Sequence, residues 1–166
     1  MTEDNGYLRD QINRYHESKR LLDEVQRRDS SDATTGLFNR NVGEGYLRLR
    51  LSDDTTVTVF TLDLSAAKHC DEATLQRASQ ALVEFNGTFE MICRWGPRRF
   101  LLITAAEVRP GDILAQIKRR LKAADVAEVR FVIARSQPGD KVGDIIARLD
   151  DQLSRSSNQA RLPKSK

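Results

Sequence analysis

Residues 88–104 read TFEMICRWGPRRFLLIT and predict a β-hairpin. Two short apolar runs, residues 88–94 and 98–104, are separated by Trp95-Gly96-Pro97. Glycine and proline interrupt regular structure and favour a turn, so the two runs are expected to pair as neighbouring strands. The chain is therefore predicted to contain an antiparallel sheet around which its other elements pack.

The segments on both sides of the hairpin alternate between strand and helix patterns. Residues 56–64 are rich in β-branched residues and apolar on both faces, which is typical of a central strand, and residues 129–134 predict a further strand. Apolar residues at helical spacing predict helices over residues 39–51 and 71–85, from residue 110 onward, and over residues 142–153. This order predicts an α+β sandwich with helices on one or both faces of a mainly antiparallel sheet.

Residues 7–28 contain no glycine or proline and predict a separate N-terminal helix. Its apolar stripe is narrow and is interrupted by Lys19 and Gln26, so the helix is expected to be only marginally stable on its own. Pairing with a second copy of the chain is favoured over packing on its own domain, and the basic side chain in the seam makes a concentration-dependent homodimer the expectation. The residues of this stripe are Leu8, Ile12, Tyr15, Leu22 and Val25.

The composition excludes several classes of protein. With 166 residues and 39% hydrophobic residues, the chain fits one domain plus an extension. A net charge of +3, with basic residues that do not interleave with aromatic ones, argues against a nucleic-acid partner. The one local basic excess, at Lys118, Arg119, Arg120 and Lys122, is interpreted as the solvated face of a helix.

Targeting and cysteine patterns point to the cytoplasm. No apolar run approaches the roughly 20 residues of a membrane span, and the N-terminus has no secretory pattern, so no membrane partner is expected. Only Cys70 and Cys93 are present, without metal-like spacing, which argues against a disulfide framework and a zinc site.

Four segments, in chain order, resemble the GGDEF domain of diguanylate cyclases. Residues 32–40 (DATTGLFNR) resemble the D-x-L-T-G-L-x-N-R segment that opens this domain, with Thr34 as the departure. Residues 62–64 (LDL) match the end of the family's first core strand, and residues 94–100 (RWGPRRF) occupy the hairpin position of R-[YFW]-G-G-[DE]-E-F. Residues 145–153 (IIARLDDQL) are similar to the closing L-L-x-x-A-D-x-A-L-Y helix.

The resemblance implies a GGDEF/nucleotide-cyclase-like fold, which is a ferredoxin-like palm sandwich. It also implies a bacterial signalling protein with three parts. Residues 1–29 would form a signalling or coiled-coil helix, residues 30–157 a degenerate GGDEF domain, and residues 158–166 a disordered polar tail.

The hairpin departs from the family signature where the chemistry depends on it. In active members, as the resemblance implies, the second glycine lets the backbone approach the GTP phosphates, and the acidic side chain that follows helps to hold divalent cations. Proline in place of that glycine fixes φ and removes an N–H group, and guanidinium groups in place of carboxylates repel Mg²⁺. We therefore expect no catalytic residue, no metal and no cofactor at a signature that reads Gly96, Pro97, Arg98, Arg99 and Phe100.

Other family sites are also incomplete. Asp63 matches the first metal-binding aspartate, but the second acidic position is Ser65, so Asp63 is expected to be solvated or paired with a nearby arginine. The guanine-recognising loop is shortened around residues 69–72, and no guanine pocket can be assigned. The inhibitory R-x-x-D motif falls on Gly87 and Glu90 and lacks its arginine.

These departures leave two functional hypotheses ahead of a third. The first is a catalytically inactive GGDEF-like domain that acts as a regulatory or protein-interaction module, with an unidentified protein partner. The alternative is a sensor that binds cyclic di-GMP or a guanine nucleotide through the arginine-bearing hairpin without turnover. A residual diguanylate cyclase comes third, because it would need metal and guanine sites built from residues that this chain lacks.

Overall fold

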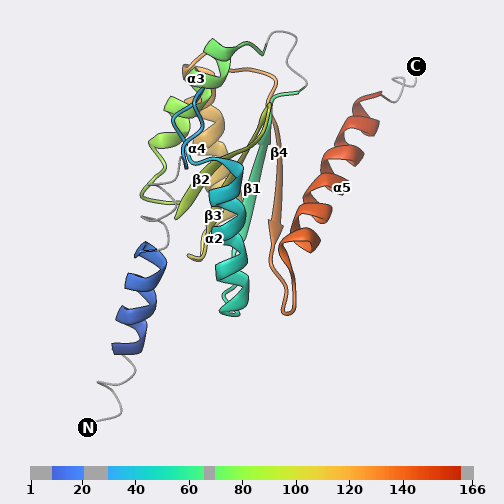
Figure 1. Cartoon of the computed structure of the whole chain (residues 1–166). Helices are drawn as coiled ribbons and strands as arrows, with labels where there is room; N and C mark the ends of the chain where they lie inside the picture. The colour runs from blue at the N-terminus through green and yellow to red at the C-terminus, as the bar shows by residue number, and fades with distance from the viewer. Residues whose placement is uncertain (1–8, 21–29, 66–69, 162–166) are drawn as a thin grey trace.

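The computed structural model describes residues 9–20, 30–65 and 70–161 of the chain. Its centre is a four-stranded sheet in the order β2-β3-β1-β4, with every neighbouring pair antiparallel (Figure 1). The strands are β1 (Thr58–Asp63), β2 (Met91–Gly96), β3 (Arg99–Thr104) and β4 (Arg130–Arg135). The predicted hairpin is confirmed as β2 and β3, and the antiparallel α+β sandwich is confirmed with it.

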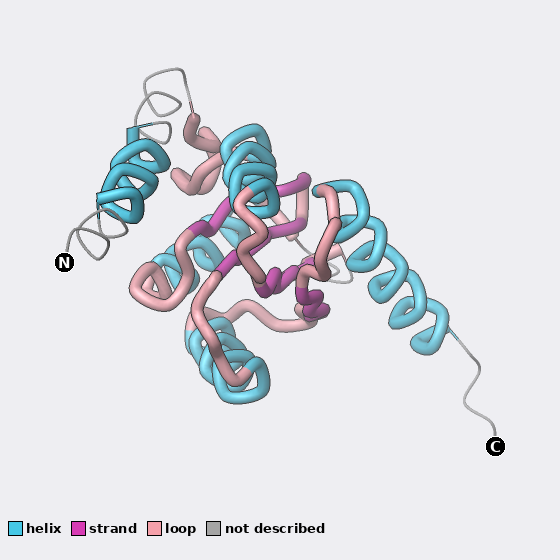
Figure 2. Tube along the Cα trace, turned by 90° about the horizontal axis from the view of Figure 1, so that it is seen from below, coloured by secondary structure: helices cyan, strands magenta, loops and turns pink. Residues whose placement is uncertain are grey.

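Helices cover both faces of the sheet. They are α2 (Arg40–Ser52), α3 (Glu72–Val83), α4 (Pro110–Ala123) and α5 (Val142–Arg161). One hydrophobic cluster joins α3 and α4 to one face, and a second joins α2 and α5 to the other. The strands therefore lie between two helical layers (Figure 2). From β1 to β4 the elements follow the ferredoxin-like order βαββαβ.

The sequence of β1 explains its central place. Successive side chains of a strand point to opposite faces. Phe60 and Leu62 accordingly enter the cluster beneath α3 and α4, whereas Val59 enters the cluster beneath α2 and α5. Because all three are buried, β1 has to lie between two other strands, as the double-sided apolar pattern predicts.

Local contacts set the start and the depth of α2. The side chain of Asn39 accepts a hydrogen bond from the N–H of Val42 at 3.1 Å and so caps the helix. Gly43 then packs directly on β2, because a Cβ atom at this position would lie 2.3 Å from Sγ of Cys93. The absence of a side chain thus sets how closely α2 approaches the sheet.

The chain itself engages both edges of the sheet. At the outer edge of β4, Nε2 of Gln152 donates to the carbonyl of Ile133 at 3.2 Å, and Nη2 of Arg148 donates to the carbonyl of Arg135 at 3.0 Å. At the outer edge of β2, the N–H of Arg94 donates to the carbonyl of residue 38 at 2.8 Å.

The N-terminal helix is present over residues 9–20. Ile12 and Tyr15 of the predicted stripe are 52% and 65% exposed. Leu8, Leu22 and Val25 lie outside the described residues. Within the part of the chain that the structure describes, no helix combines the length and apolarity that a membrane crossing requires.

The end of α5 differs from the sequence prediction. The helix continues to Arg161, past residue 158, where the disordered tail is predicted to begin. Residues 154–161 (SRSSNQAR) contain neither glycine nor proline, and the first proline beyond them is Pro163. Polar composition alone therefore does not end a helix that no breaker interrupts.

Candidate functional site

A row of three charged residues crosses the end of the sheet. Asp63 ends β1 and is the cross-strand partner of both Arg99 on β3 and Arg130 on β4. Nη2 of Arg130 lies 2.5 Å from Oδ2 of Asp63, and the two side chains are 23% and 10% exposed. The expected pairing of Asp63 with a nearby arginine is therefore present, and a largely buried carboxylate is neutralised by a guanidinium group.

Ser65 completes the contacts of this carboxylate. Its N–H donates to Oδ1 of Asp63 at 3.0 Å and its hydroxyl donates to Oδ2 at 2.8 Å, while Nη2 of Arg130 also lies 2.9 Å from the same hydroxyl. A divalent cation here would need several oxygen ligands and would meet a fixed positive charge. Asp63, Ser65 and Arg130 therefore do not form a site that fits such a cation. Over residues 9–20, 30–65 and 70–161, no cluster of three His, Cys, Asp or Glu residues could hold a metal ion.

The hairpin turn borders a cleft of about 460 Å³. Its walls come from residues 95–99, from Arg40 at the start of α2, and from Ile146 and Asp150 of α5. Nη1 of Arg99 forms an ion pair with Oδ1 of Asp150 at 2.7 Å, so this signature side chain points to α5. The guanidinium of Arg40 lies 4.5 Å from the centroid of the Trp95 ring, in cation–π contact.

The side chain of Arg94 holds the backbone of the hairpin turn. Nη2 of Arg94 donates to the carbonyl of Pro97 at 2.8 Å, and Nε of Arg94 donates to the carbonyl of Gly96 at 3.3 Å. Pro97 and Arg98 are exposed at the tip of the turn, and Phe100 is fully buried in the core beneath α3 and α4. The turn therefore presents a proline and an arginine to the cleft, while its aromatic residue serves packing.

The two predicted inhibitory-site positions are engaged differently. Glu90 faces α2, where its carboxylate accepts hydrogen bonds from Nη2 of Arg50 at 2.6 Å and from the hydroxyl of Tyr46. Its second oxygen accepts from the N–H of Ala105 at 3.1 Å. Gly87 is exposed in the loop after α3, with no contact near its Cβ position. Sequence reasoning missed the two α2 partners because they lie at least 40 residues from Glu90 in the chain.

Comparison with known proteins gives the fold. No protein-family model and no curated protein matches the sequence. Among solved structures, the coiled coil and GGDEF domain of DgcB from Caulobacter crescentus, in complex with c-di-GMP, is similar with a TM-score of 0.67 at 16% identity. That match covers 95% of each chain.

Two further structures share the fold in larger assemblies. The diguanylate cyclase SiaD of Pseudomonas aeruginosa, solved with its activator SiaC, gives a TM-score of 0.58 at 17% identity over 95% of this chain and 73% of that one. The S helix-GGDEF-EAL structure of Vibrio cholerae LapD, bound to c-di-GMP, gives 0.65 at 14% identity over 89% and 39%. Together with the four motifs in their order, these neighbours identify the chain as a domain with the fold of the GGDEF domains of diguanylate cyclases.

Proposed function

We propose that this chain is a catalytically inactive GGDEF-like domain that acts as a regulatory or protein-interaction module in bacterial cyclic di-GMP signalling. The observation that carries the proposal is the row formed by Arg99, Asp63 and Arg130. Where the family's chemistry requires divalent cations held by carboxylates, the carboxylate of Asp63 is bound by the guanidinium group of Arg130. The guanidinium group carries a fixed positive charge, which opposes the binding of a divalent cation at this carboxylate.

The turn of the hairpin supports the same conclusion. Backbone N–H groups hold phosphate oxygens in many nucleotide sites. Pro97 has no N–H group to offer. A triphosphate at this turn would therefore meet fewer donors than a glycine pair provides.

A cyclase assay tests the proposal directly. Purified protein at micromolar concentration, incubated with GTP and either Mg²⁺ or Mn²⁺, is expected to form no cyclic di-GMP. An active diguanylate cyclase in the same buffer is the positive control. Turnover that the variant Asp63→Ala abolishes would show that the site is catalytic.

The proposed partners are proteins, including a second copy of this chain. The exposed Ile12 and Tyr15 on the N-terminal helix support self-association. The coiled coil of DgcB and the complex of SiaD with its activator are precedents on the same fold for a helix ahead of the domain and for a bound protein.

A second candidate function is a nucleotide sensor that does not turn over its ligand. The cleft of about 460 Å³ supports it, because Arg40 and Arg98 line that cleft without an ion-pair partner among the described residues. Guanidinium groups bind phosphate and stack on bases. Calorimetric titration with GTP and cyclic di-GMP separates the two functions: micromolar binding that Arg98→Ser weakens favours the sensor, and no heat of binding favours the interaction module.

A further inference from the structure

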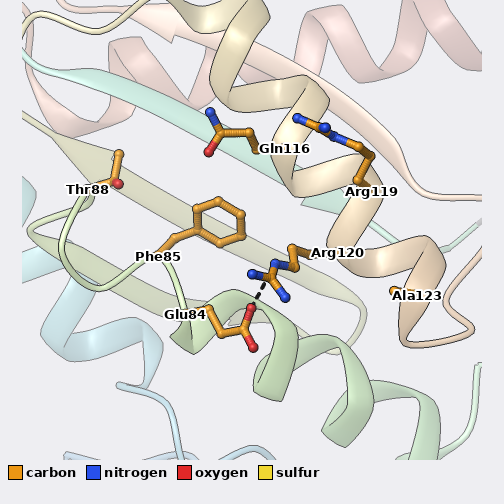
Figure 3. Close-up of a pocket in the computed structure, with 7 residues that line it drawn as sticks. All are labelled: Glu84, Phe85, Thr88, Gln116, Arg119, Arg120 and Ala123. Carbon is orange, nitrogen blue, oxygen red and sulfur yellow. Dashed lines mark ion pairs between the residues drawn. The ribbon is translucent and has the colours of Figure 1, made fainter.

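A groove lies between α3 and α4, on the face of the sheet opposite the hairpin cleft. Two adjoining cavities of about 600 and 330 Å³ form it, and both are lined by Glu84, Arg120 and Ala123 (Figure 3). One cavity joins residues 84–88 to residues 116–120, and the other joins residues 77–81 to residues 123–124. The two helices therefore run antiparallel along the groove.

The floor of the groove is apolar and belongs to the hydrophobic core. Phe85 and Ala81 are buried members of the core cluster beneath α3 and α4. Longer polar side chains, including Gln116 and Arg119 of α4, rise at its sides (Figure 3). The part that α4 contributes, residues 116–123, extends about 10 Å at 1.5 Å per residue, which is about two turns of a helix.

The charge of the groove is unbalanced. Arg77, Arg119 and Arg120 line it against one carboxylate, Glu84. Nε of Arg120 pairs with Oε2 of Glu84 at 2.9 Å, across the middle of the groove (Figure 3). Arg119 forms no ion pair with any described residue, whereas Nη2 of Arg77 donates to the hydroxyl of Thr74 at 3.3 Å.

The other basic side chains of α4 do not belong to this groove. Nζ of Lys118 lies 5.4 Å from the centroid of the Phe131 ring, on the flank of α4 that faces β4. Lys122 is exposed and does not line either cavity. The basic cluster of the sequence therefore divides into a solvated part and a part that borders a hollow surface.

We propose that the α3–α4 groove binds an acidic amphipathic helix of a protein partner. A helix laid between two helices buries one narrow apolar face, here against Phe85 and the alanines, and presents carboxylates at i, i+3 and i+4 to the basic rims. Arg119 supplies positive charge that no described carboxylate pairs with, and such a helix complements it. The proposal rests on the proposed role as an interaction module and names the chemistry of the partner.

The described residues of the groove offer a nucleotide no aromatic ring on which a base could stack. Nucleobases bind proteins largely by stacking on exposed aromatic rings or guanidinium planes. Among the described residues that line the groove, Phe85 is the one aromatic side chain, and it is 7% exposed. Its ring therefore supports an apolar contact from above but offers no free face for a base.

The test is a titration of the ¹⁵N-labelled full chain, followed by NMR. The probe is a short synthetic helical peptide with Glu and Leu at i, i+3 and i+4 spacing, and the control peptide carries Lys in place of Glu. We expect the acidic peptide to shift amide signals of groove residues, with an affinity that falls as salt is added. The basic peptide is expected to cause no shifts there.

Three variants sharpen the test. Arg119→Glu is expected to weaken binding of the acidic peptide by about tenfold or more, because it reverses an unpaired charge on the rim. Glu84→Gln is expected to tighten binding by about two- to fivefold, because it releases Arg120 from an exposed ion pair. Lys122→Glu is the matched charge reversal outside the groove and is expected to leave the affinity within about twofold. Thermal unfolding followed by circular dichroism checks that each variant is folded.

Each other outcome overturns the proposal. If no amide signals shift at millimolar peptide, the groove does not bind the helix. If Arg119→Glu and Lys122→Glu lower the affinity equally, the binding reflects only general attraction between opposite charges. Cyclic di-GMP that shifts the same signals at lower concentration than the peptide assigns the groove to a nucleotide. The cyclase assay probes the opposite face of the sheet, so a failure here is distinguishable from a failure of the proposed function.

Discussion

Arg94 and Asp32 form an ion pair that joins the hairpin to the turn before α2. Nη1 of Arg94 lies 3.0 Å from Oδ2 of Asp32, although 62 positions separate the two residues in the chain. The same carboxylate oxygen accepts hydrogen bonds from the N–H of Thr35 at 2.9 Å and from its hydroxyl at 2.8 Å. Because Arg94 also binds the carbonyls of the hairpin tip, one guanidinium group fixes two turns at once.

Loss of this guanidinium should destabilise the domain. Both side chains of the pair are about four-fifths buried, at 17% and 20% exposed, so Arg94→Met is expected to lower the free energy of unfolding by about 1–3 kcal/mol. The matched control is Arg155→Met, which breaks the exposed pair with Asp151 and is expected to change stability by less than about 0.5 kcal/mol. Urea unfolding measures both. Equal effects would show that the buried pair carries no special weight.

The pH dependence of stability should reflect aspartates whose pKa is lowered in the fold, among them Asp32 and Asp140. Burial alone would raise the pKa of Asp32, but hydrogen bonds from Thr35 and the Arg94 guanidinium outweigh it and lower that pKa. The hydrogen bond from Arg148 lowers the pKa of Asp140. Groups with a lowered pKa stabilise the folded state above the unfolded pKa, near 4, and lose this contribution as the pH falls below it.

Urea midpoints are therefore expected to be steady between about pH 7 and 5 and to fall below about pH 4. Asp140→Asn should reduce the steepness of that fall. The Asp140 carboxyl binds a proton more readily in the unfolded state than in the folded state, and the variant lacks this carboxyl. A midpoint that stays constant down to pH 3 would contradict the assignment.

The contact between α2 and β2 predicts a steric effect. Gly43→Ala would place Cβ 2.3 Å from Sγ of Cys93 and is expected to lower the free energy of unfolding by about 1–3 kcal/mol. Cys93→Ala removes the clashing sulfur, so the double variant should be more stable than the sum of the two single effects. Additive effects in urea unfolding would mean that the helix shifts without strain.

Restoring the hairpin signature should not create a cyclase. The triple variant Pro97→Gly, Arg98→Asp, Arg99→Glu leaves Arg130 on Asp63, and it does not change the loop that the sequence predicts to be too short to bind guanine. Chromatographic assay of the triple variant with GTP and Mg²⁺ is expected to detect no cyclic di-GMP. Product formation would show that the hairpin alone limits activity.

Self-association should depend on the N-terminal helix. Charges at its apolar stripe, in Ile12→Glu with Tyr15→Glu, are expected to convert a dimer of the full chain into a monomer in light scattering at high micromolar concentration. Arg14→Glu changes the charge of the same helix outside the stripe and should leave the dimer intact. The prediction is wrong if the wild-type chain is monomeric throughout this range.

The sequence predicts the fold well because its strongest signals are local. The hairpin follows from Gly96 and Pro97 between two apolar runs, and the central place of β1 follows from apolar side chains on both of its faces. The end of α5 was less predictable, because a polar segment without a breaker can be either helix or tail. Local composition thus predicts which elements exist better than where they end.

The site was predictable in kind but not in its partners. An arginine partner for Asp63 was expected, yet Arg130 lies 67 residues away and is brought there by the register between β1 and β4. For the same reason Glu90 gave no sign that it binds Tyr46 and Arg50. Contacts that depend on strand register and helix packing leave no trace in a single local motif.

The occupied edges of the sheet limit how this protein can associate. A foreign strand that adds to β4 would have to displace the side chains of Gln152 and Arg148 from their carbonyls, and one that adds to β2 would have to displace residue 38. Open strand edges are the usual templates for amyloid-like growth and for domain swapping. As long as α5 and residue 38 stay in place, strand addition is opposed at both edges, and detachment of α5 would expose the edge of β4 to it.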